Sequence, residues 1–169
     1  MIHRWITIIC ILLVAALLET ALLSNIIFLP AVPDLLLLIV LYLSVYNGSL
    51  TGETAGFVSG LMLDFLTAAP LGLNCLLRTL VGFFSGLCHN LLNVSGIVIP
   101  CLLALVATIV KFVIVEFISF FFPAGVITYE LLSMEFGMEL LLNVVLAPVV
   151  FGFLSLFSSF LIDGTESPR

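Results

Sequence analysis

Charged residues are scarce in this chain. Only 8% of its 169 residues are Asp, Glu, Lys or Arg, and 63% are hydrophobic, whereas soluble domains carry about 25% charged residues. A water-facing surface cannot be built from so few polar side chains, so the composition excludes a soluble globular domain. The four Lys and Arg residues also provide no basic patch for nucleic acid. The composition therefore predicts an integral membrane protein.

The residue sets that carry catalysis or bind metals are also missing. The chain has two histidines, and the sequence shows no His–Ser–Asp constellation, phosphate-binding loop or cluster of carboxylates. No pair of cysteines has metal-ligand spacing, and we interpret all four as small apolar core residues: Cys10, Cys75, Cys88 and Cys101. We therefore predict a protein without enzymatic activity, cofactor or metal.

Six apolar segments follow one another; most are close to or longer than the roughly 20 residues that cross a bilayer, and the second is short for a span. We predict one all-α, polytopic transmembrane domain over residues 1–169. The first segment is interpreted as a retained helix because it is longer than a signal-peptide core and no cleavage motif follows it. Arg4 and Arg169 both favour cytoplasmic termini. The predicted helices cover residues 5–28, 34–46, 52–68, 71–92, 97–122 and 138–162.

The connection over residues 127–137 mixes acidic and apolar residues at loosely helical spacing. We interpret it as an interfacial helix lying on the membrane, and a plain connecting loop is the alternative. Its apolar side chains at Leu132, Met134 and Phe136 are candidate residues for binding a partner.

Two rows of residues spaced four apart run through apolar sequence, and such residues share one face of a helix. The first row is Gly52, Gly56, Gly60 and Asp64. The second row carries the opposite charge and is Asn74, Arg78, Gly82, Gly86 and Asn90. Glycines at this spacing let two helices approach closely in a membrane. The rows therefore predict a tightly packed helical hairpin.

Charges inside apolar segments are costly and need partners. Asp64 and Arg78 flank the turn at residues 70–71 almost symmetrically, which predicts a salt bridge between them. The alternative is that Asp64 reaches the outer surface while Arg78 meets backbone carbonyls. Glu19 and Lys111 lie at roughly matching depths in their segments and are a second candidate pair.

The stretch from Pro33 to Phe84 resembles the rod shape-determining MreD family. The shared pattern is a proline at the entrance of the second helix, here Pro33, followed by G-F-x-x-G-x-x-x-D over Gly56–Asp64 and a Leu71–Gly72 turn. The resemblance implies a six-helix fold similar to the S component of energy-coupling-factor transporters.

The resemblance also implies a function. Members of this family are multi-pass proteins of the bacterial inner membrane that act as non-enzymatic scaffolds in cell elongation. The implied partners are MreC, the wider elongation complex with MreB, RodZ, RodA and the elongation transpeptidase, and membrane lipid. A substrate-binding S component of a vitamin transporter is the alternative, because the implied fold is shared.

Overall fold

The computed structural model of the protein describes residues 2–22, 31–67, 70–89, 91–92, 94, 96–121 and 134–162. Among these residues all regular structure is helical. The elements are α1 (Ile2–Leu17), the π-helix η1 (Leu18–Leu22), α2 (Leu35–Asn47), α3 (Ser49–Leu66), α4 (Leu73–Leu87), α5 (Val98–Phe121), α6 (Met134–Ser155) and α7 (Ser158–Leu161). The predicted all-α class is confirmed.

Three helical stretches are long and apolar enough to cross a bilayer: His3–Ala21, Val98–Phe121 and Met134–Ser155. Helices α2 and α4, with 13 and 15 residues, are shorter. Large apolar side chains face outward, such as Phe117 and Phe120 on α5, as a lipid-exposed surface requires. The protein is thus a polytopic helical membrane protein, and the count of six spans stays a prediction.

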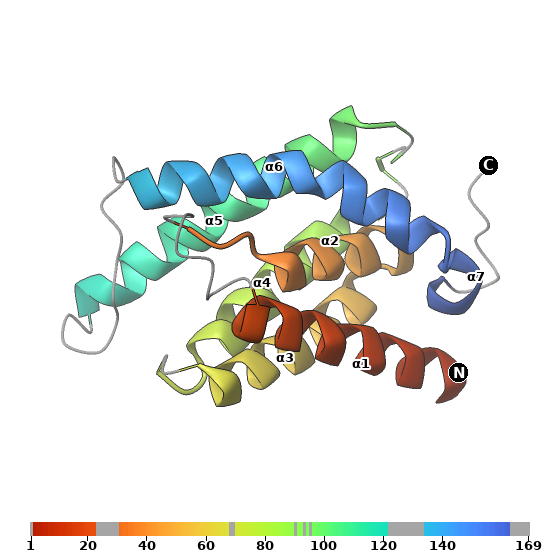
Figure 1. The fold of residues 1–169 in the computed structure, drawn as a ribbon, viewed down its shortest axis with the longest axis horizontal. Coiled ribbons are helices and arrows are strands. Elements are labelled where there is room, and N and C mark those ends of the chain that lie inside the picture. The colour runs from red at the N-terminus through yellow and green to blue at the C-terminus, as the bar shows by residue number, and fades with distance from the viewer. Residues whose placement is uncertain are drawn as a thin grey trace.

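Helix α2 lies at the centre of the bundle, and the longer helices surround it (Figure 1). It packs against α1, α3, α4, α5 and α6. Ten consecutive residues, Leu36 to Val45, are buried. A helix that is apolar on all sides lies either in a protein core or in lipid, and the burial of α2 places it in the core. This explains how a helix of only 13 residues belongs to a membrane domain: its surface contacts protein and not lipid.

The helix ends differ from the predicted ones near the connection between α5 and α6. Helix α6 begins at Met134, so residues 134–137 form its first turn and not the end of a separate interfacial helix. Leu132 and the rest of the predicted interfacial segment lie outside the described residues. At the other end, α6 stops at Ser155 and the short helix α7 follows, where one continuous segment to residue 162 was predicted.

The turn between α3 and α4 contains a glycine in the left-handed region. Gly72 has φ +94° and no heavy atom within 4 Å of an added Cβ. We expect Gly72→Ala to destabilise the protein by about 1–2 kcal/mol through backbone strain alone. Unfolding by SDS titration in mixed micelles measures the effect. Gly137→Ala, with equally open surroundings and no positive φ, is the matched control, and equal stability of the two variants would contradict the prediction.

Candidate functional site

Helices α3 and α4 meet backbone to backbone, with the glycines of both predicted rows at the contact. An added Cβ on each of these glycines would overlap the backbone of the opposite helix: Gly52 on Gly82, Gly56 on Arg78, Gly60 on Cys75 and Gly86 on Ser49. We call this contact the glycine seam. Such close approach supplies dispersion contacts that lipid cannot match and drives helix association in membranes.

A serine of the central helix α2 forms hydrogen bonds with the glycine seam. The buried Ser44 hydroxyl donates a hydrogen bond to the Gly82 carbonyl at 2.6 Å and lies 2.7 Å from the Ser85 hydroxyl. Because Gly82 has no side chain, its carbonyl is accessible to a neighbouring helix. The seam therefore positions α2, α3 and α4 as one unit.

Asp64 ends the first glycine row and binds the start of α4. Its carboxylate accepts hydrogen bonds from the backbone N–H groups of Gly72 at 2.9 Å, Asn74 at 3.1 Å and Cys75 at 3.2 Å, and from the Asn74 side chain at 3.0 Å. The first N–H groups of a helix lack partners within the helix and carry partial positive charge. Asp64 thus supplies acceptors for the N–H groups at the partly exposed start of α4, and it forms no ion pair within the part of the chain that the structure describes.

The predicted salt bridge between Asp64 and Arg78 is therefore wrong. Arg78 lies opposite Gly56, about two helical turns from Asp64 along α3. The prediction assumed a turn centred on residues 70–71. Instead α3 ends at Leu66 and α4 begins only at Leu73, so Asp64 is level with the first turn of α4.

Loss of the Asp64 carboxylate is expected to destabilise the hairpin. In Asp64→Ala the N–H groups at the start of α4 lose their acceptor, which should cost about 2 kcal/mol or more. Asp64→Asn keeps one acceptor oxygen and should cost less. SDS unfolding of the purified protein measures both changes, and wild-type stability of the alanine variant would refute this capping role.

Arg78 instead joins a cluster of five charged side chains, which come from η1, α4, α5, α6 and the N-cap of α2 and which we call the charge cluster. Arg78 Nη2 lies 2.7 Å from Asp34 Oδ1 and 3.6 Å from Glu19 Oε1. Lys111 Nζ lies 2.8 Å from Asp34 Oδ2 and 2.7 Å from Glu139 Oε1. Asp34 therefore bridges the two cations, and the predicted pairing of Glu19 with Lys111 is wrong because Asp34 and Glu139 occupy the Lys111 ammonium.

The cluster also completes the N-terminus of α2, which begins inside the bundle. Asp34 is the N-cap and accepts from Leu37 N–H at 2.9 Å, while Glu19 Oε2 accepts from Leu36 N–H at 3.1 Å. The amide oxygen of Asn143 accepts from the Asp34 N–H at 2.8 Å. Buried N–H groups at a helix start need such acceptors, so the same carboxylates serve the helix and the cations.

A cavity of about 260 Å³ adjoins the charge cluster. Asp34 and Arg78 are each 3% exposed, whereas the Lys111 side chain is 26% exposed. Arg78 Nη1 is buried and has no hydrogen-bond acceptor in the part of the chain that the structure describes. No set of three or more His, Cys, Asp or Glu residues in that part is arranged to hold a metal ion.

These features define a class of protein: a polytopic helical membrane protein with a glycine-packed hairpin and a buried charge cluster. A family model described as the rod shape-determining protein MreD matches residues 1–157. The chain belongs to the MreD family, and it is accordingly a membrane protein of the rod shape-determining class. No curated protein and no solved structure matches it significantly.

Proposed function

We propose that the protein is a non-enzymatic scaffold of the bacterial inner membrane that binds MreC and supports lateral peptidoglycan synthesis. In this role it belongs to an elongation complex with MreB, RodZ, RodA and the elongation transpeptidase, and both of its termini are cytoplasmic. The observation that carries the proposal is the family match over residues 1–157. The family is a shape-determining one, which supports a structural and not a catalytic role.

The interior of the protein supports a scaffold as well. Every ionisable group of the charge cluster contacts an opposite charge or a helix N-terminus within the protein. The glycine seam joins the central helices without flexible side chains between them. A rigid centre of this kind holds the outward surfaces of α1, α5 and α6 in fixed positions, as a binding platform for membrane-embedded partners requires.

The most direct test is depletion of the protein in its own rod-shaped or spiral host, followed by microscopy and by co-purification of MreC. Rounding of the depleted cells would support the scaffold, and so would loss of MreC co-purification with a protein whose charge cluster is disrupted by Arg78→Met. Unchanged cell shape after full depletion would refute it. The cavity beside the charge cluster is the feature that the alternative, a vitamin-binding transporter component, would need; unchanged shape with a new vitamin requirement would favour that alternative.

The start of α6 is our candidate for the MreC contact. Met134 is 77% exposed, whereas the Phe136 ring packs on Phe112 with centroids 4.5 Å apart. Met134 can therefore be changed without disturbing the contact between α5 and α6. We expect Met134→Ser to reduce MreC co-purification several-fold, because an exposed apolar anchor is lost.

Leu156→Ser is the matched control, since Leu156 is also 77% exposed but lies just after the other end of α6. We expect this variant to retain MreC. Equal retention of MreC by both variants would exclude the start of α6 as the contact.

A further inference from the structure

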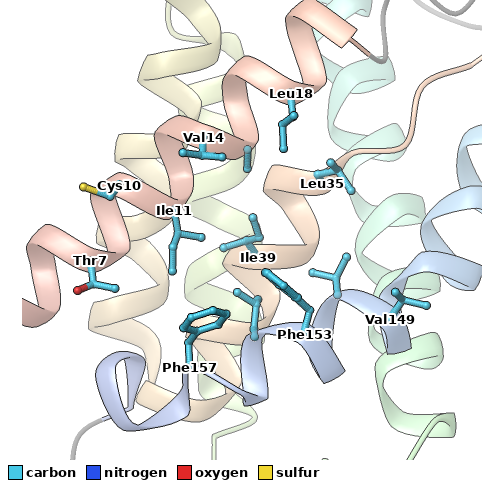
Figure 2. Close-up of a pocket in the computed structure, with 13 residues that line it drawn as sticks. Thr7, Cys10, Ile11, Val14, Leu18, Leu35, Ile39, Val149, Phe153 and Phe157 are labelled. Carbon is cyan, nitrogen blue, oxygen red and sulfur yellow. The ribbon is translucent and has the colours of Figure 1, made fainter.

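A long apolar groove runs along the bundle between α1 and α6, with α2 as its floor (Figure 2). Its volume is about 560 Å³. The lining is almost wholly aliphatic and aromatic, with side chains from α1, α2 and α6 such as Val14, Ile39 and Phe153. In a bilayer such a groove accepts only an apolar occupant, since polar groups would lose their hydrogen bonds there.

One end of the groove adjoins the charge cluster. Leu18 and Leu35 line the groove at this end (Figure 2). The residues next to them in sequence, Glu19 and Asp34, line the charged cavity. The groove and the cavity thus share the start of η1 and the start of α2 as a common wall. An apolar channel that ends beside a charged cavity matches the two parts of an amphiphile.

The charges of the cavity specify the polar part. Among the described residues that line it, four acids face two cations: Glu19, Asp34, Glu135 and Glu139 against Arg78 and Lys111. The two cations are engaged by Asp34, Glu19 and Glu139. What remains is an excess of carboxylate and one buried donor without an acceptor, Arg78 Nη1. A ligand that brings an ammonium group and an oxygen acceptor would satisfy both.

We propose that the groove and the cavity together bind one aminophospholipid, with an acyl chain in the groove and the headgroup in the cavity. The headgroup ammonium then faces the surplus carboxylates, and a phosphate or ester oxygen accepts from Arg78. A glycerol headgroup carries no cation, so an anionic phospholipid such as phosphatidylglycerol is disfavoured by the net negative cavity. This proposal does not rest on the proposed binding of MreC.

The test is native mass spectrometry of the full-length protein with phosphatidylethanolamine or phosphatidylglycerol added in equal amounts. We expect one tightly held phosphatidylethanolamine per protein, preferred over phosphatidylglycerol by about tenfold. Glu135 takes part in none of the ion pairs of the charge cluster, so Glu135→Gln keeps that cluster intact and should reduce the preference. Val14→Trp fills the groove and should remove the bound lipid.

Val113→Trp is the control for the groove. Val113 is 57% exposed on α5, close to the 55% of Val14, but it does not line the groove. Size-exclusion profiles establish that each variant is folded. Equal retention of the two lipids, or equal lipid binding by the Val14→Trp and Val113→Trp proteins, would overturn the proposal. Loss of MreC from the Val14→Trp protein with unchanged lipid binding would show that the groove holds a partner helix instead.

Discussion

Gly56→Leu is expected to prevent assembly of the α3–α4 hairpin. Even a Cβ at this position would overlap the backbone of Arg78 and lie within 3.0 Å of Thr79 Cα. Backbone atoms of a packed helix cannot rotate away as a side chain can, so α3 and α4 would have to separate. We expect a loss of more than about 3 kcal/mol, seen as aggregation or as unfolding at much lower SDS concentration. In cells the variant should fail to restore rod shape after depletion.

Gly152→Leu on α6 is the matched control. Gly152 also lies within a membrane helix, but an added Cβ there would meet nothing within 4 Å. The control protein should keep wild-type stability and should restore cell shape. If the Gly56 variant were as stable as this control, α3 and α4 could not be in backbone contact.

Replacement of Arg78 by methionine is expected to cost about 3–5 kcal/mol, because it leaves buried carboxylates without their cation. Asp34 would retain Lys111, but Glu19 would lose the one cation within 4 Å that the described residues provide. In the double variant Asp34→Asn/Arg78→Met one of these carboxylates is neutralised. Its loss of stability should be smaller than the sum of the single losses by about 1–3 kcal/mol.

The double variant Asp64→Asn/Arg78→Met is the control for the double variant Asp34→Asn/Arg78→Met. These residues share no ion pair and bind different partners, so their effects should add within about 0.5 kcal/mol. SDS unfolding of the single and double variants measures both couplings. Non-additive losses of stability for residues 64 and 78, together with additive losses for residues 34 and 78, would show that Arg78 pairs with Asp64 and not with Asp34.

The glycine seam was predictable from the sequence because its signal is local. Glycines four residues apart define one face of a helix whatever surrounds it, and a short connection makes consecutive helices antiparallel neighbours. The relative shift of the two helices was not predictable. It depends on how many residues leave the helix at the turn, and α3 and α4 end and begin unevenly about residues 70–71.

The ion pairs of the charge cluster could not be predicted from the sequence, although some of its residues could. A proline followed by Asp34 at the entrance of an apolar helix is an N-cap signal that can be recognised in the sequence. On α6, Glu139, Asn143 and Ala147 are spaced four residues apart and mark a polar face. The sequence did not show that these elements meet, because their contacts join residues far apart in the chain: 77 positions separate Asp34 from Lys111, and 109 separate Asp34 from Asn143. Partner choice among buried charges is set by which helices are neighbours, and no local pattern contains that information.

The contact between Asp34 and Arg78 is the centre of this account, since it joins the glycine seam to the start of the buried helix α2. Solid-state NMR of the protein in lipid bilayers measures it directly, with ¹³C-labelled aspartate carboxyls and ¹⁵N-labelled arginine side chains. The account predicts a strong carboxyl–guanidinium cross-peak that disappears in Asp34→Asn and persists in Asp64→Asn. A cross-peak that instead survives the change at Asp34 and is lost on the change at Asp64 would contradict it.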